Sequence, residues 1–152
     1  MAMWKEDTRC MVKIKRLKPA AQIPRYEYPD DSGADIYAIE ECTLQPLERK
    51  AIDTGLCVEV PEGFELQVRP KSGLALESGI TVLNTPGTID SGYRGEIKVI
   101  LINLGSESYQ IRKGQKIAQL VAAPVVRVDF REVERLSESG RGIGGFGSTG
   151  IV

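Results

Sequence analysis

The chain has 152 residues, of which 41% are hydrophobic, so it can bury one ordinary core but is too short for two full domains. Its 20 Lys and Arg residues almost cancel its 21 Asp and Glu residues, and a formal net charge of -1 excludes a strongly basic nucleic-acid-binding or membrane-surface protein. The sequence contains no histidine, which excludes a histidine general base, a histidine metal ligand and histidine-activated nucleophiles.

The chain carries no sign of export or membrane insertion. No apolar run approaches the roughly 18 residues of a membrane span, and the N-terminus lacks the apolar core and cleavage site of a signal peptide. The three cysteines, Cys10, Cys42 and Cys57, form no Cys-x-x-Cys pair and are expected to be reduced thiols. We therefore expect a soluble, cytoplasmic protein.

Short apolar runs recur along the chain, and each has the alternation or the length of a β-strand. The expected strands cover residues 11–17, 54–60, 64–68, 96–102 and 116–121. Turn signals separate them at residues 29–33, 61–63, 85–87, 91–92 and 113–114. This spacing is typical of sandwiches and barrels, so the sequence predicts an all-β domain.

One short helix is expected at residues 73–79, with Ser72 as its N-cap. The preceding residues, 69–73, place cations and a hydroxyl beside helix N–H groups that favour a phosphate. An ordinary capped turn is the alternative interpretation of this segment.

We interpret residues 87–96 as the tip of a hairpin, entered by a strand at residues 82–84 and left by a strand that begins at Ile97. The tip carries Asp90 and Tyr93, and Asn84 precedes it. An acid, an aromatic wall and an amide donor would suit a small polar ligand. A purely structural turn is the alternative.

The composition changes toward the C-terminus, where residues 137–150 are dominated by Gly, Ser and Thr and cannot form a core of their own. We expect a single domain over residues 1–136 and a flexible glycine-rich arm over residues 137–152. A mere linker is one interpretation of the arm. A lid ordered by a nucleotide is the other, with Arg141 for phosphate and Phe146 for a base.

Five segments, taken together, resemble in order and spacing the five motifs of the trimeric dUTPase family. They are residues 32–38, 69–75, 87–96, 113–120 and 141–150. The fifth matches the family pattern Arg-Gly-x-Gly-Gly-Phe-Gly-Ser-Thr-Gly without a break. The sequence departs from the pattern at Ser32, where alanine is common, and at Lys71, where the family usually has arginine. Lysine lacks the planar guanidinium with which arginine binds a phosphate through two hydrogen bonds, and Arg69 is the candidate to supply that bidentate binding instead.

The resemblance implies a dUTP diphosphatase, a hydrolase that converts dUTP to dUMP and pyrophosphate by attack of water on the α-phosphorus. Such an enzyme supplies dUMP for thymidylate synthesis and keeps uracil out of DNA. The resemblance also implies a homotrimer of distorted, β-clip-like jelly rolls that exchange their C-terminal arms. The cofactor would be Mg²⁺, held by substrate phosphates and water rather than by side chains, with no nucleic acid or membrane as a partner.

The resemblance also assigns roles to individual residues. Asp90 would orient and polarise the attacking water, for which an ionised aspartate of ordinary pKa suffices. Tyr93 would stack beneath the deoxyribose and leave no room for a 2′-hydroxyl, and a narrow pocket would reject the thymine methyl group. The other nucleoside contacts would come from Asn84, Gly87, Thr88, Ile89 and Lys98, with Phe146 stacked on uracil. The phosphate contacts would come from Lys71, Ser72, Gly73, Gln119, Arg141, Gly147, Ser148 and Thr149.

Two alternative functions stay open. A dCTP deaminase, or a bifunctional deaminase and diphosphatase, shares the fold but typically needs a glutamate in the pocket where this chain has Asp90. A non-enzymatic nucleotide-binding regulator would bind dUTP without releasing pyrophosphate. The presence of Asp90, Tyr93 and the complete fifth motif argues against the regulator.

Overall fold

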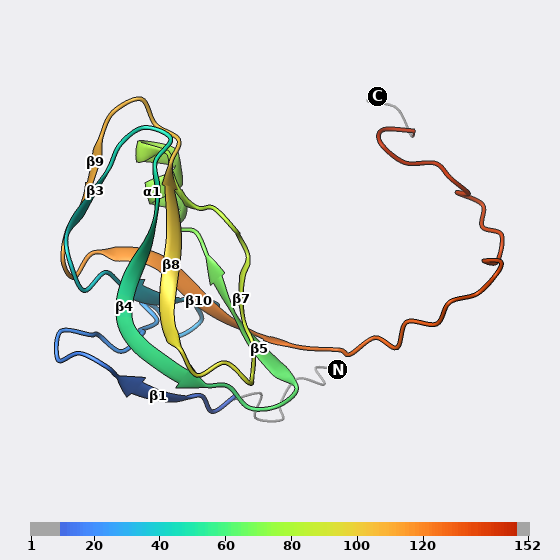
Figure 1. Cartoon of the computed structure of the whole chain (residues 1–152), viewed down its shortest axis with the longest axis horizontal. Helices are drawn as coiled ribbons and strands as arrows, with labels where there is room; N and C mark the ends of the chain where they lie inside the picture. The colour runs from blue at the N-terminus through green and yellow to red at the C-terminus, as the bar shows by residue number, and fades with distance from the viewer. Residues whose placement is uncertain (1–9, 149–152) are drawn as a thin grey trace.

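The computed structural model describes residues 10–148 and contains an all-β body with one short helix (Figure 1). One four-stranded sheet has the order β1-β4-β8-β6, which are Lys13–Arg16, Arg49–Glu59, Glu96–Asn103 and Ile80–Val82. The other has the order β2-β10-β5-β7, which are Ala34–Tyr37, Lys116–Pro124, Phe64–Arg69 and Gly87–Ile89. A two-stranded sheet pairs β3, Cys42–Leu44, with β9, Tyr109–Ile111.

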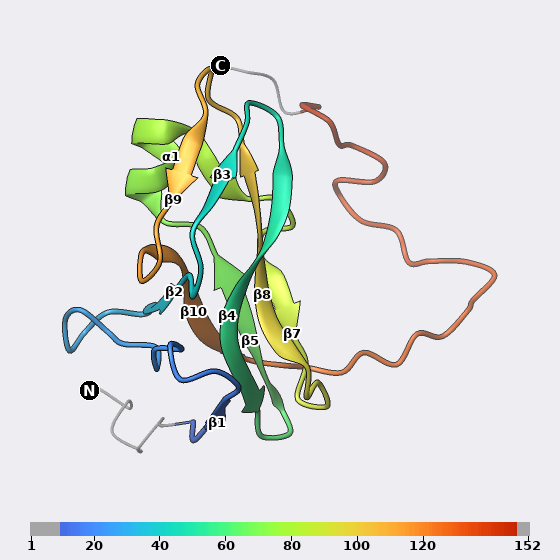
Figure 2. The ribbon, with the colours of Figure 1, turned by 60° about the vertical axis from the view of Figure 1, so that its left-hand side comes forward.

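The core lies between the two larger sheets and is filled by side chains that alternate along the strands. In β8, Ile97, Val99 and Leu101 are buried, while Lys98 between them is exposed. Strand β4 runs beside β8 in the same sheet (Figure 2). Each buried aliphatic side chain stabilises the folded state by about 1.5–3 kcal/mol relative to an exposed one.

The connections make the body a distorted jelly roll, because every strand from β5 to β8 lies in the opposite larger sheet from the strand before it. The prediction of an all-β domain with one short helix is therefore confirmed. The structure describes no membrane-spanning candidate among its helices over residues 10–148.

The expected hairpin tip at residues 87–96 is wrong in its topology. Strand β7 pairs with β5 in the second sheet, whereas β6 and β8 pair with each other in the first. The chain therefore crosses between the sheets twice on its way from β6 to β8. The entering strand also lies earlier than expected, because Gly79, with φ of 67°, ends the helix and the buried Ile80 begins β6 at once.

The helix α1 covers Ser72–Ser78, and its N-cap is Lys71 rather than Ser72. Lys71 has an extended backbone because the chain leaves β5 in that conformation, and its carbonyl oxygen accepts the N–H of Ala75 at 3.1 Å. The lysine side chain makes no capping hydrogen bond. It is directed instead to the site described below.

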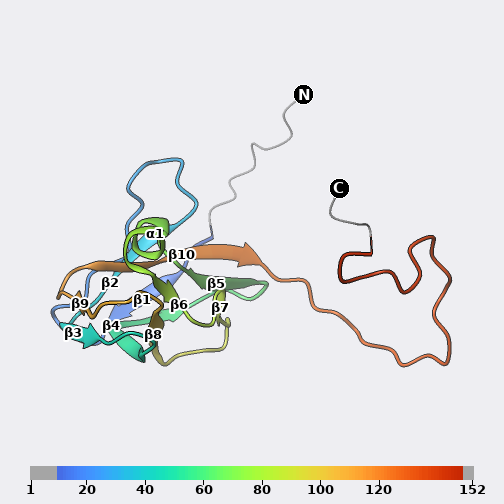
Figure 3. The same ribbon diagram turned by 90° about the horizontal axis from the view of Figure 1, so that it is seen from above.

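The chain leaves the body after β10. The N–H of Val125 donates to the carbonyl oxygen of Gly63 at 2.8 Å, and the following residues extend away from the sheets (Figures 1 and 3). Large apolar side chains are exposed along this segment, including Val126, Phe130 and Leu136. The division of the chain at residue 136 stays a prediction, although the last strand already ends at Pro124.

Candidate functional site

Two surface cavities contain most of the site residues that were predicted in the body of the chain. The first, which we call the β7–β8 cavity, has a volume of about 270 Å³ and is lined by Ala51, Val68, Asn84, Gly87, Thr88, Ile89, Tyr93, Glu96, Ile97, Lys98 and Ile100. Every nucleoside contact predicted from the body of the chain lines this cavity. Asp90 is exposed and directly follows Ile89, at the end of β7.

Hydrogen bonds to backbone carbonyl oxygens shape the turn between β7 and β8. The N–H of Tyr93 donates to the carbonyl oxygen of Asp90 at 3.0 Å. The Arg94 guanidinium donates to the carbonyl oxygens of Ser91 and Tyr93, at 2.7 and 2.9 Å. The Tyr93 hydroxyl donates to the carbonyl oxygen of Glu96 at 3.0 Å. The turn therefore holds the candidate catalytic acid and the candidate aromatic wall in one hydrogen-bonded unit.

Side chains of β8 anchor this turn to the neighbouring strand. The Glu96 carboxylate accepts the N–H of Gly55 at 2.8 Å, where the pairing of β4 with β8 is interrupted. The Lys98 ammonium lies 2.9 Å from the carboxylate of Asp53. The hydrogen bond to Asp53 raises the pKa of Lys98 above its ordinary value, so this lysine is charged at neutral pH.

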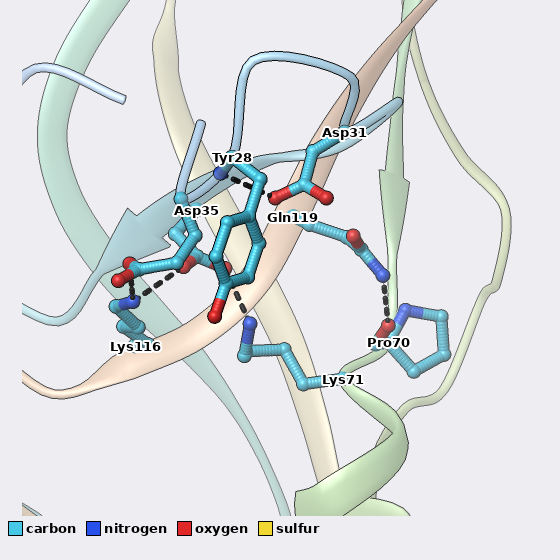
Figure 4. A network of polar contacts seen from close by, with 8 residues as sticks. Tyr28, Asp31, Asp35, Pro70, Lys71, Lys116 and Gln119 are labelled. Carbon is cyan, nitrogen blue, oxygen red and sulfur yellow. Dashed lines mark hydrogen bonds and ion pairs between the residues drawn. The ribbon is translucent and has the colours of Figure 1, made fainter. Parts of the chain in front are cut away.

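The second cavity, which we call the β2–β10 cavity, has a volume of about 380 Å³ and is lined by Glu27, Asp31, Ser32, Gly33, Asp35, Arg69, Lys71, Lys116, Gln119 and Val121. It brings together two predicted phosphate contacts, Lys71 and Gln119 (Figure 4). The Gln119 amide donates to the carbonyl oxygen of Pro70 at 2.9 Å, which ties β10 to the residues before α1. Ser72 and Gly73 follow Lys71 in the exposed first turn of α1.

The β2–β10 cavity is organised around Asp35, which received no role in the sequence analysis. The carboxylate is buried and accepts hydrogen bonds from Lys71 and from Lys116, the latter at 2.8 Å (Figure 4). Lys116 also lies 2.7 Å from Glu27. The sequence offered one signal for this role of Asp35, which is a carboxylate inside the otherwise apolar run Ala34–Tyr37. A charge buried in a strand requires a partner of opposite charge.

The two lysines determine the ionisation of Asp35. Burial raises the pKa of its carboxyl group, but hydrogen bonds from Lys116 and Lys71 outweigh burial and leave the pKa below its ordinary value. The pKa of Lys116 is raised above its ordinary value, mainly by its hydrogen bond to Asp35 and next by its hydrogen bond to Glu27. Lys71 thus has a carboxylate partner, and an anionic ligand must compete with Asp35 for its ammonium.

The substitution Asp35→Asn is expected to destabilise the fold at neutral pH, because it leaves two lysines beside a neutral amide. The free energy of unfolding should fall by an amount between two limits. Removal of an exposed ion pair costs about 1 kcal/mol and removal of one partner of a fully buried pair costs about 3–5 kcal/mol, and both lysines here are partly exposed. The pKa of Asp35 in the folded state lies below its value of about 3.9 in the unfolded chain. The ion pairs therefore contribute their full stabilisation above a pH of about 3.9, and this stabilisation disappears as the pH falls through the folded-state pKa.

Urea unfolding of both proteins at pH 7 and pH 3 measures this effect. The difference in unfolding free energy between wild type and Asp35→Asn should shrink at pH 3. Asp30→Asn, which changes an exposed acid in the preceding loop, is the matched control and should stay within about 0.5 kcal/mol of wild type. An equal loss for Asp35→Asn at both pH values would contradict the ion-pair explanation.

Arg69, the candidate to compensate for Lys71, lines the same cavity. Its guanidinium donates to the side-chain oxygen of Gln67 through two nitrogens, at 3.0 and 2.6 Å. Gln67 in turn donates to Glu65 at 2.6 Å. The cavity therefore holds a guanidinium and two ammonium groups beside the carboxylates of Glu27, Asp31 and Asp35. An anionic ligand would have to take the place of a carboxylate partner on these cations.

The arm residues lie apart from both cavities within one chain. Arg141, Phe146, Gly147 and Ser148 are exposed, and none of them lines either cavity. The Arg141 guanidinium donates to the carbonyl oxygen of Gly144 at 2.8 Å, within the arm itself. Thr149 lies outside the described residues. A single chain therefore presents the predicted site residues in three separate groups.

Comparisons with known proteins agree on one family. A family model described as dUTPase matches residues 19–150. The deoxyuridine 5'-triphosphate nucleotidohydrolase of Gloeothece citriformis is 54% identical over 141 residues, which is 93% of this chain and 97% of that relative. The solved dUTPase of Staphylococcus bacteriophage 80alpha with dUPNHPP has a TM-score of 0.86 and 29% identity, covering 93% of this chain and 99% of its own. A mutant dUTPase of phage phi11 of S. aureus, whose structure reveals the coordination of a structural Mg(II) ion, has a TM-score of 0.77 and 25% identity. The match covers 84% of this chain and 99% of the phage enzyme.

Proposed function

The chain belongs to the dUTPase family, and we propose that it hydrolyses dUTP to dUMP and pyrophosphate by attack of water on the α-phosphorus. The observation that carries the proposal is the β7–β8 cavity, which gathers Asn84, Thr88 and Tyr93 beside Asp90. Thr88 lies on β7, Asn84 lies in the connection before β7, and Asp90 and Tyr93 lie in the connection after it, so the crossing of the chain between the sheets brings them to one place.

We assign Asp90 the positioning of the attacking water. Its carboxylate is exposed, so water reaches it, and the Tyr93 N–H holds the backbone of the turn in place. Phosphoryl transfer through a loose transition state requires alignment and charge neutralisation more than a strong base. An ionised aspartate that accepts a hydrogen bond from the water meets this requirement without a histidine.

The β7–β8 cavity would hold the nucleoside. The Asn84 amide and the backbone of β7 supply donors and acceptors for uracil, and the Tyr93 ring supplies a flat wall for the deoxyribose. Gly87, Thr88, Ile89 and Lys98 complete the contacts. The walls of this cavity, with the Tyr93 ring on one side, would leave no room for a thymine methyl group or a 2′-hydroxyl.

The triphosphate would be held by the cations of the β2–β10 cavity and by the arm. Lys71 would exchange Asp35 for a phosphate oxygen, and Gln119, Ser72 and Gly73 would donate to neighbouring oxygens. From the arm, Arg141, Gly147, Ser148 and Thr149 would cover the phosphates while Phe146 stacks on uracil. Closure of the arm would exclude water and strengthen these electrostatic contacts.

The residues present fit a magnesium ion that is carried mainly by the substrate. Among the described residues, no group of three or more Cys, Asp or Glu side chains is arranged to hold a metal ion. Asp35, the buried carboxylate of the β2–β10 cavity, is already paired with two lysines. We propose that Mg²⁺ would be held by phosphate oxygens of the substrate and by water, because this ion keeps several waters and binds few protein groups beside substrate phosphates. When bound there, it neutralises charge that develops on the phosphates.

We further propose a homotrimer whose sites lie between subunits. The two cavities share no lining residue, and the described arm contacts neither of them. Val126, Val128 and Phe130 alternate along an extended segment with their side chains exposed, which is the pattern of a strand that lacks a partner. A neighbouring subunit would cover this face, and residues 137–152 would close over its site.

The activity would lie in the cytoplasm, where dUMP feeds thymidylate synthesis, and would keep uracil out of DNA. Release of pyrophosphate from dUTP, dTTP, dCTP and UTP in the presence of Mg²⁺ tests the proposal. We expect release from dUTP, with dTTP, dCTP and UTP at least about a hundredfold slower. Ammonia from dCTP would instead identify a deaminase, and tight dUTP binding without pyrophosphate would identify a regulator.

A further inference from the structure

The ring of Tyr93 lies against Gly95, and this contact leaves no space for a side chain. A Cβ atom at Gly95 would lie 2.4 Å from the Tyr93 hydroxyl oxygen, 2.6 Å from Cζ and 3.0 Å from Cε2. The glycine is not required by its backbone conformation, because its φ is outside the left-handed region. The requirement at Gly95 is therefore for space beneath the ring.

The ring is held in this position from its far end. Its hydroxyl donates to the carbonyl oxygen of Glu96 at 3.0 Å, and the Glu96 carboxylate accepts the N–H of Gly55 at 2.8 Å. The position of the ring is thus tied through Glu96 to the junction of β4 and β8. Because Tyr93 also lines the β7–β8 cavity, the same contacts fix one wall of that cavity.

We propose that Gly95 is a specificity-determining positioning residue, whose missing side chain lets the Tyr93 ring lie at the depth that excludes a 2′-hydroxyl. This inference rests on the proposed function, in which that ring faces the deoxyribose. A methyl group at Gly95 would push the ring outward by on the order of 1 Å and would break its hydrogen bond to Glu96. A wall that is no longer fixed excludes the ribose hydroxyl less effectively.

The change should alter selectivity more than folding. The Tyr93 side chain is 45% exposed, so it can move toward solvent without opening the core. The expected result for Gly95→Ala is that the ratio of kcat/KM for dUTP to kcat/KM for UTP falls at least about tenfold. The KM for dUTP should rise more than kcat falls, because Gly95 touches no reacting atom.

Gly92→Ala is the matched control. It makes the same substitution in the same turn, but a Cβ atom at Gly92 would meet nothing within 4 Å. Its ratio should stay within about twofold of wild type. Full-length proteins are compared in Mg²⁺, after size-exclusion chromatography and thermal melting show that each variant assembles like wild type.

Wild-type hydrolysis of dUTP and UTP is measured first. If the wild-type protein does not hydrolyse dUTP, the proposed function and this inference are both overturned. If Gly95→Ala keeps the wild-type preference for dUTP over UTP, only the role of Gly95 is overturned. A crystal structure of Gly95→Ala that retains the hydrogen bond from Tyr93 to Glu96 would also overturn it. If Gly95→Ala fails to assemble, Tyr93→Phe tests the fixed ring on which the role of Gly95 depends, because it removes the hydrogen bond to Glu96. A lowered ratio of kcat/KM for dUTP to kcat/KM for UTP supports the inference, and an unchanged ratio overturns it.

Discussion

The substitution Asp90→Asn should lower kcat for dUTP hydrolysis by about 10²- to 10⁴-fold while dUTP binding stays within a few-fold of wild type. The amide keeps the shape of the carboxylate but removes the negative charge that orients and polarises the water. Binding should persist because the predicted nucleoside contacts line the β7–β8 cavity, to which the Asp90 side chain does not contribute. Steady-state pyrophosphate release gives kcat, and calorimetry with a non-hydrolysable dUTP analogue gives Kd.

Asp30→Asn is a suitable control for this substitution, because it makes the same chemical change at an exposed loop position outside both cavities. Its turnover should match that of wild type. If purified Asp90→Asn assembles correctly and hydrolyses dUTP at a near-normal rate, Asp90 is not the catalytic group. A combined loss of binding and turnover would instead assign Asp90 a structural role in the turn.

Removal of residues 141–152 should leave a folded oligomer whose kcat/KM for dUTP is reduced at least about a hundredfold. The fold should persist because the described part of this segment hydrogen-bonds within the arm, as Arg141 does to Gly144. The rate should fall because the phosphate donors and the stacking ring are lost, and water enters the site. Size-exclusion chromatography with light scattering measures the oligomeric state, thermal melting measures the stability of the fold, and steady-state kinetics measure kcat/KM.

A shorter truncation that removes only Ile151 and Val152 leaves the fifth motif complete and is the control, with kinetics expected to match wild type. Unaltered kinetics in the longer truncation would show that the arm is a linker. A monomeric product would show that the arm holds the subunits together, which would contradict the proposed division between a body that assembles and an arm that closes.

Much of the scaffold was predictable because it depends on local periodicity. The alternation of Ile97, Val99 and Leu101 with more exposed residues indicates a half-buried strand in any tertiary context, and the structure confirms it as β8. In contrast, β3 and β9 were not predicted. Each is only three residues long, and they are defined by their pairing with each other rather than by a pattern of their own.

The all-β class and the single short helix could be predicted from local patterns, and five ordered motifs indicated the family. Tertiary structure alone decided that β7 crosses to the opposite sheet from β8, because sheet membership depends on which distant strands pair. It also decided that Lys71 binds Asp35, a residue 36 positions away, rather than standing free for phosphate. Local patterns encode which side of a strand is buried, whereas a buried carboxylate obtains its partners only when the folded chain brings cations from other strands and loops to it.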